Sequence, residues 1–114
     1  MAAIEVGVED GVVVAGVGGE VDLATAHTVV AELAAAVSTD SPGLVIDMSD
    51  LTFLDSSAVG GLFRLGRQLR DRRQGMRLVV PTASPVARVL ELVEIGRLAP
   101  LHETRADAVA ALRR

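Results

Sequence analysis

The sequence predicts an α/β fold in which a mixed, mostly parallel sheet of about five strands packs with about four helices and begins with a β-hairpin. Strand-like and helix-like patterns alternate along most of the chain, which is typical of parallel sheets covered by helices. Half of the 114 residues are apolar, yet only 2% are aromatic. The core therefore has to be built from Val, Ile, Leu and Ala, with β-branched strands beneath Leu- and Ala-rich helices.

The hairpin lies at the N-terminal end of the sequence. Ile4 to Val8 alternate between apolar and polar residues, as in a half-buried strand. Glu9-Asp10-Gly11 provides turn residues, with Gly where a positive φ is favoured, and Val12 to Val17 forms the second strand. We expect Gly18-Gly19 to end this second strand.

The first helix and a central strand come next. Asp22 is a favourable N-cap, and apolar residues then recur at helical spacing. These residues are Ala26, Val29, Val30, Leu33 and Val37. Residues 38–43 are rich in Ser, Pro and Gly and predict a loop. Leu44 to Met48 is almost entirely apolar, as expected for a strand whose two faces are both covered.

A second helix follows residues 55–57 and carries an apolar stripe on one face. The stripe consists of Val59, Leu62, Leu65, Gly66 and Leu69, and most of the arginines of this segment lie off it. We expect Gly75 to end the helix and Met76 to Val80 to form the next strand.

Two more helices and a short strand complete the expected order. Ser84-Pro85 combines a capping Ser with Pro at the first helical position, and this helix should stop at Gly96. Its expected apolar residues are Val86, Val89, Leu90 and Val93. Leu98 to His102 is a short last strand, and Thr104 with Asp107 resembles a capping box at the start of the final helix.

The most informative part of the chain is the turn Asp55-Ser56-Ser57, where a buried strand leads into a helix. Unpaired N–H groups and the dipole of a helix N-terminus favour negative charge, so a phosphate can be held there. Sites in such sheets lie beyond the carboxyl ends of the strands. We therefore expect this turn and the turn 18–22 to open on the same edge of the sheet.

The composition excludes several classes of protein. The net charge of −4 and the pI of about 5.0 provide no basic surface for nucleic acid. The absence of Cys excludes disulfides and thiolate metal sites, and the absence of Lys excludes lysine-dependent catalysis. No apolar run approaches the ~20 residues of a membrane span, and Met1 to Glu5 lacks the basic start of a signal peptide. We expect a cytoplasmic single domain over residues 1–114 that needs no cofactor or metal.

Three motifs resemble those of a known family. They are Gly19-Glu20-Val21-Asp22 followed by Thr25-Ala26, the run from Val45 to Ser57, and Ala83-Ser84-Pro85-Val86 followed by a helix ending near Ile95-Gly96. With this order and spacing, which cover almost the entire chain, the sequence resembles the STAS domain in its bacterial form, the anti-sigma factor antagonist. The family often has Gly after the second hydroxyl residue, whereas this chain has Ala58. Ala is the better helix former, so we expect a firmer first turn.

The resemblance implies the STAS fold and a switch that works by protein binding rather than catalysis. In the family, the unmodified domain binds an anti-sigma factor that is also a serine kinase, and this frees the sigma factor. The kinase phosphorylates the first hydroxyl residue after the Asp, which ends binding, and a phosphatase resets the domain. The matching phosphoacceptor here is Ser56, with Ser57 as the alternative. Asp22 matches a position near the nucleotide site of the kinase, so the expected partner-binding residues are Asp22, Asp55, Ser56 and Ser57.

Simpler interpretations of the same residues stay open. Ser56 and Asp22 could each be only a helix cap. Three aspartates between residues 47 and 55 suggest a cation, but divalent sites need more oxygen ligands in a defined loop. Gly16 to Gly19 lacks the third glycine of a dinucleotide fingerprint. A hydrolase triad of Ser56, a His and Asp47 would lack the flanking glycines of a nucleophile elbow.

Two other functions and a second surface remain as alternatives. The runner-up function is a STAS regulatory subunit of another assembly, such as an ABC transporter-associated regulator or a signalling scaffold, and a small serine hydrolase comes third. The segment from Arg64 to Arg77 also forms a basic cluster in an acidic protein. Its arginines are Arg64, Arg67, Arg70, Arg72, Arg73 and Arg77. The simpler interpretation of these arginines is a solvated helix face. The functional interpretation is a contact surface for an acidic partner.

Overall fold

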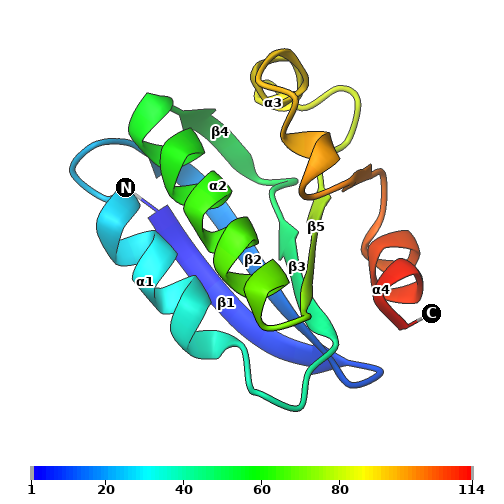
Figure 1. Ribbon diagram of the computed structural model, residues 1–114. Coiled ribbons are helices and arrows are strands. Elements are labelled where there is room, and N and C mark those ends of the chain that lie inside the picture. Colours follow the sequence, from blue (N-terminus) through cyan, green and yellow to red (C-terminus); the bar gives the residue numbers. More distant parts are fainter. Residues whose placement is uncertain (1, 114) are drawn as a thin grey trace.

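The computed structural model consists of a six-stranded sheet with helices on both faces (Figure 1). The structure describes residues 2–113, so Met1 and Arg114, the two ends of the expected domain, lie outside it. In chain order the elements are β1 (Ala2–Glu9), β2 (Val12–Val21), α1 (Ala26–Ala36), β3 (Gly43–Asp47), β4 (Leu51–Leu54), α2 (Ser56–Asp71), β5 (Gly75–Val79), α3 (Ala87–Leu92), the 3-10 helix η1 (Ile95–Arg97), β6 (Leu101–His102) and α4 (Arg105–Arg113).

The strand order confirms the mostly parallel sheet predicted from the sequence. It runs β1-β2-β3-β5-β6, with β4 paired to β2, and only the β1–β2 hairpin is antiparallel. The hairpin turns through Asp10 and Gly11, both at positive φ, as the Glu9-Asp10-Gly11 turn predicts. The additional sixth strand is β4, which the sequence pattern alone did not reveal.

Strand β2 is longer than expected, and Gly18-Gly19 does not end it. Gly19 has a φ of +85°, and the register with β4 shifts between Gly19 and Glu20, which marks a β-bulge. The first part of β2 pairs with β3 and the last part with β4, while β1 occupies its other edge. β3 and β4 therefore pair with the same edge of β2, one after the other, and residues 48–50 separate them.

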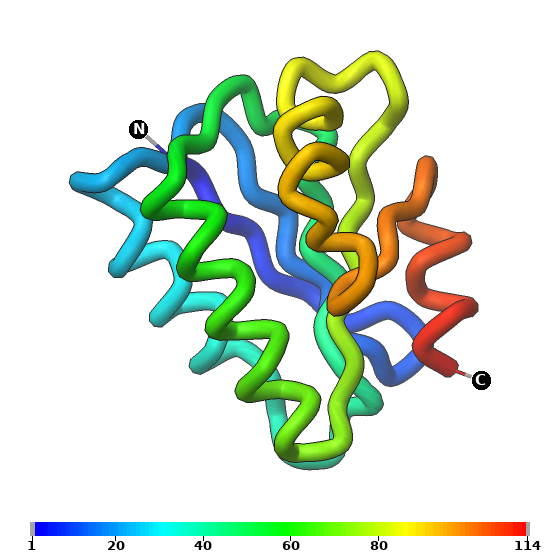
Figure 2. Tube along the Cα trace, turned by 45° about the horizontal axis from the view of Figure 1, so that its top comes forward, coloured from blue at the N-terminus to red at the C-terminus, as the bar shows by residue number. Residues whose placement is uncertain are grey.

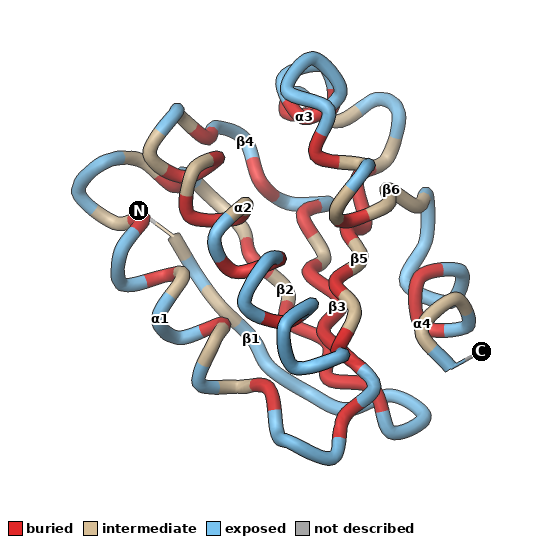
Figure 3. The backbone as a smooth tube through the Cα atoms, in the orientation of Figure 1, coloured by how far each residue is buried: buried red, intermediate tan, exposed pale blue. Residues whose placement is uncertain are grey.

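The helices divide unequally between the two faces of the sheet. Alternate residues of β2, such as Val13 and Ala15, join the core beneath α1, α2 and α3, whereas Val12 and Val14 pack under α4. The central strands are consequently buried on both faces, and Figure 3 shows buried residues concentrated along β3 and β5. Within residues 2–113, no helix is both long and apolar enough to cross a membrane.

Several helix boundaries differ from the sequence prediction. α2 ends at Asp71 rather than at Gly75. Arg73 takes a φ of +61°, and Gln74 N–H donates to the Leu69 carbonyl, so Arg73 occupies the left-handed position of a Schellman motif that Gly usually takes. A residue other than Gly at this position conceals the helix end in the sequence.

Helix α3 also differs from its prediction, because it is short and ends at Leu92. Leu90 is buried as expected, but Val89 and Val93 are exposed. The predicted last strand, Leu98 to His102, is shorter in the structure, where β6 consists of Leu101–His102. In front of α4, Thr104 Oγ1 accepts a hydrogen bond from Asp107 N–H at 3.1 Å, which confirms the capping role of Thr104.

Candidate functional site

Two turns form the candidate site at the carboxyl end of the sheet. One follows β2 at residues 22–25, and the other follows β4 and leads into α2. Because β2 and β4 are parallel neighbours, both turns leave the sheet at the same end. In Figures 1 and 2 the loop after β2 lies beside the start of α2. The expectation that the two turns share one edge is therefore confirmed.

The carboxylate of Asp55 joins these turns. Its Oδ1 accepts a hydrogen bond from Ala58 N–H at 3.1 Å, and its Oδ2 accepts one from Leu23 N–H at 2.9 Å. Asp55 itself has extended backbone and occupies the N-cap position of α2. One side chain thus starts the helix and fixes the neighbouring turn against it.

Ser56 is the first residue of α2, is exposed, and is not the N-cap. The interpretation of Ser56 as a simple cap is wrong, because Asp55 makes the capping hydrogen bond. The structure provides no hydrogen-bond partner for the Ser56 hydroxyl among residues 2–113. Ser57 is half-buried, so its hydroxyl is less accessible than that of Ser56.

Asp22 organises the first turn rather than capping α1 directly. Its Oδ1 accepts hydrogen bonds from Ala24 N–H at 3.0 Å and Thr25 N–H at 3.2 Å, and Asp22 N–H donates to Thr25 Oγ1 at 3.1 Å. The helix begins only at Ala26, with Thr25 in the N-cap position. The prediction that Asp22 is the N-cap is therefore wrong, because the N-cap is Thr25, three residues later. The Asp22 side chain nevertheless accepts hydrogen bonds from backbone N–H groups ahead of the helix.

Two exposed apolar side chains lie on the turn after β2 and on β4, the segments that adjoin the serine, and were not found from the sequence. Leu23 is 77% exposed in the first turn, and Phe53 is 48% exposed near the end of β4. Exposed large apolar residues beside a polar centre are typical of protein-binding surfaces. No sequence signal marked them, because Leu23 and Phe53 look like core residues until β4 and the turn are known.

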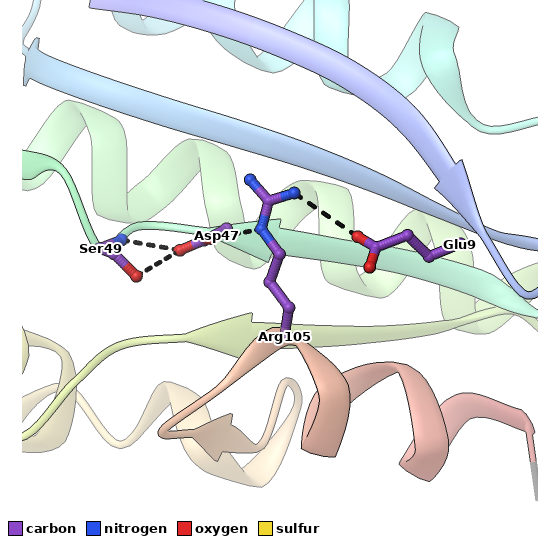
Figure 4. A network of polar contacts seen from close by, with 4 residues as sticks. All are labelled: Glu9, Asp47, Ser49 and Arg105. Atoms are coloured by element: carbon purple, nitrogen blue, oxygen red, sulfur yellow. Dashed lines mark hydrogen bonds and ion pairs between the residues drawn. The ribbon is translucent and has the colours of Figure 1, made fainter.

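A second polar network lies on the α4 face of the sheet (Figure 4). Arg105 Nε donates to Asp47 Oδ2 at 2.6 Å, and its Nη1 lies 3.5 Å from Glu9 Oε2. Ser49 donates to Asp47 through both its N–H and its hydroxyl. Burial alone would raise the pKa of Asp47, but the hydrogen bonds from Arg105 and Ser49 outweigh it and hold the pKa below its ordinary value.

This network leaves the alternative interpretations of Asp47 without support. Its carboxylate is engaged by Arg105 and Ser49, whereas a hydrolase triad would need it to orient a His. Among the described residues, no group of three or more His, Cys, Asp or Glu side chains is arranged to hold a metal ion. Asp47 instead ties the start of α4 to the end of β3.

The arginines between Arg64 and Arg77 do not form one cluster. Arg64, Arg67 and Arg70 are exposed on α2. Arg77 pairs with Val45 in the sheet and shares its α4 face, with Arg77 Nη1 3.3 Å from His102 Nε2. The basic surface of α2 is therefore separate from Arg77.

Comparison with known proteins is consistent with this architecture. The family model described as the STAS domain matches residues 3–108. The chain is 33% identical over 96 residues to the anti-sigma-F factor antagonist RsfA of Mycobacterium tuberculosis, covering 82% of this chain and 73% of RsfA.

Solved structures show the same likeness. An anti-sigma factor antagonist from Mycobacterium paratuberculosis superposes with a TM-score of 0.83 and 30% identity, covering 100% of this chain and 96% of that one. The Bacillus cell fate determinant SpoIIAA in its phosphorylated form has a TM-score of 0.68 and 24% identity, over 97% of this chain and all of SpoIIAA.

Proposed function

The chain belongs to the STAS domain family, and from that membership we propose that it is an anti-sigma factor antagonist regulated at Ser56. Its unphosphorylated form binds an anti-sigma factor with serine kinase activity and thereby frees a sigma factor. Phosphorylation of Ser56 ends this binding, and a phosphatase restores it. The relatives from two mycobacteria, both described as antagonists of this kind, support the proposal.

The observation that carries the proposal is the free hydroxyl of Ser56. A kinase needs an accessible hydroxyl that is not required by the fold. Asp55 meets the capping requirement of α2, so Ser56 is exposed, and its hydroxyl has no hydrogen bond to any residue that the structure describes. SpoIIAA from Bacillus, which shares this fold, has been solved in a phosphorylated form, and this supports a switch by phosphorylation.

The surroundings of Ser56 suit a protein partner. Leu23 in the neighbouring turn and Phe53 near the end of β4 present exposed apolar area, and Asp22 and Asp55 contribute negative charge. Apolar anchors with a polar rim are the usual composition of such interfaces. Asp22, Asp55, Ser56 and Ser57 are the residues that we assign to partner binding.

One phosphate can switch this surface without repacking the core. It adds about −1.5 to −2 charges at pH 7, which the N–H groups and dipole at the start of α2 tolerate in the free protein. On docking, the same charge would lie beside Asp55 and have to be desolvated against the partner. Such a conflict costs up to several kcal/mol, which suffices for release.

The phosphoacceptor is tested by incubating the purified protein with its anti-sigma factor kinase and ATP. Mass spectrometry should find one phosphate, on Ser56. Ser56→Ala should remain unmodified, while Ser57→Ala should still accept one phosphate, on Ser56. A phosphate mapped to Ser57 or Thr52 would contradict the assignment.

The same assay tests Asp22. Asp22→Ala should slow phosphorylation or weaken kinase binding, because it removes a carboxylate that we place at the interface. The matched control is Thr25→Ala, which breaks hydrogen bonds of the same turn but keeps that carboxylate. Equal effects of both substitutions would reduce Asp22 to a structural role in the turn.

A further inference from the structure

Gly60 and Gly61 have no side chains at the start of the second turn of α2, and the Arg64 guanidinium lies over them. A Cβ built on Gly60 would lie 3.6 Å from Arg64 Nη1, and one built on Gly61 would lie 3.7 Å from Arg64 Nη2. Helical side chains lean toward the helix N-terminus, which explains why the guanidinium of Arg64 lies one turn back from its own Cα. We call the half-buried surface at Gly60, beside the buried Gly61, the glycine shelf.

The glycine shelf lies between Arg64 and Ser56. Ser56, Gly60 and Arg64 are spaced four residues apart and so follow one ridge of the helix. Side chains at this spacing are about 5–6 Å apart, so the guanidinium lies roughly one turn from Ser56. A phosphate on Ser56 lengthens that side chain, and residue 60 has no side chain that would stand between the phosphate and the guanidinium.

Arg64 is also available for a new partner. It is exposed, and within residues 2–113 it makes no ion pair. Its neighbour Arg67 differs, because the Arg67 guanidinium carbon lies 5.9 Å from the centroid of the Phe63 ring. Arg70 is also exposed, but it lies six residues beyond Arg64 along α2. That is more than a turn and a half farther from Ser56.

We propose that Arg64 is the counter-charge of a phosphate on Ser56 and reaches it across the glycine shelf. The inference rests on the proposed modification of Ser56. An arginine in contact with the phosphate favours the dianion, so the modified protein carries its full charge near neutral pH. The ion pair also draws the Arg64 side chain toward the phosphate and away from any contact that it makes with the partner.

The test places phosphoserine at position 56 by co-translational incorporation, so it needs no kinase. The second pKa of the phosphate is then measured by ³¹P NMR in three proteins: otherwise unchanged, with Arg64→Gln, and with Arg70→Gln as the matched control. We expect Arg64→Gln to raise that pKa by about 0.3–0.7, as for an exposed ion pair. Arg70→Gln should leave it unchanged, and added salt should shrink the Arg64 effect.

The outcomes separate the inference from the proposed function. An unchanged pKa in Arg64→Gln would show that the helix N-terminus alone holds the phosphate, and it would overturn the role of Arg64. An equal shift in Arg70→Gln would overturn it too, since the effect would then reflect net charge alone. If the kinase failed to modify Ser56 while the Arg64 shift were present, the proposed function would fail and this inference would stand.

Discussion

At the scale of single residues, Asp55 leaves Ser56 free for modification. Asp and Ser are nearly equal as N-caps, so the sequence Asp55-Ser56-Ser57 could not show which residue caps the helix. In the structure the Asp55 carboxylate bonds both Ala58 N–H and Leu23 N–H, and Ser56 is not needed for either. The second bond joins residues 32 apart in sequence, which no local pattern predicts.

A second residue, Asp47, should make stability depend on pH. Its pKa is lowered in the folded protein, so its ion pair with Arg105 stabilises the fold above the unfolded value near 3.8. That contribution is lost as the pH falls through the lower folded value. Because Arg105 is 46% exposed, we expect Asp47→Asn to lose only about 0.5–1 kcal/mol at pH 7.

Urea unfolding between pH 7 and pH 2.5 measures this effect. The gap between wild type and Asp47→Asn should be widest at neutral pH and close in acid. Asp50→Asn is the control, because Asp50 is exposed and its carboxylate has no hydrogen bond to described residues. A gap that stays constant down to pH 2.5 would mean that the charge of Asp47 does not stabilise the fold.

At the scale of elements, long periodic segments were predictable and short or paired ones were not. The apolar stripe of α2 is buried as its spacing predicts. β4 has four residues and follows β3 after a three-residue gap, so its pattern merges with a turn. Only pairing with the bulged end of β2 reveals it as a strand. Which face of the sheet carries the Arg77 side chain likewise depends on the register of strand pairing, and local sequence patterns do not predict that register.

The two adjacent glycines of α2 should respond oppositely to substitution. A Cβ on Gly60 meets only the mobile end of Arg64, so Gly60→Ala should stabilise the helix by about 0.5–1 kcal/mol. A Cβ on Gly61 would lie 2.7 Å from Val30 Cγ2 on α1, so Gly61→Ala forces the two helices apart. We expect a net loss of about 1–3 kcal/mol for the latter.

Thermal and urea unfolding of the two alanine variants, measured against wild type, check this pair. Each variant adds the same methyl group to the same helix, so each serves as the control for the other. Destabilisation by Gly60→Ala, or stabilisation by Gly61→Ala, would contradict the described packing of α1 against α2.

At the scale of the whole molecule, strand order brings the site together. The parallel pairing of β2 with β4 places residues 22–25 beside residues 55–57. The general principle that sites lie at the carboxyl edge predicted this meeting from the sequence. The exposed Leu23 and Phe53 could not be predicted, because their exposure depends on which neighbours the fold provides.

A phosphate on Ser56 should end partner binding through a local conflict at the docking surface. The most direct measurement compares anti-sigma factor affinity and backbone amide spectra for unmodified, phosphorylated and Ser56→Asp protein. We predict that phosphorylation weakens binding by about 100-fold or more, equivalent to roughly 3 kcal/mol. Ser56→Asp should weaken it partially, since a carboxylate has less charge, and amide shifts should stay near residues 22–25 and 53–64. Unchanged affinity after complete phosphorylation, or amide shifts reaching Val12 to Val17, would contradict the account.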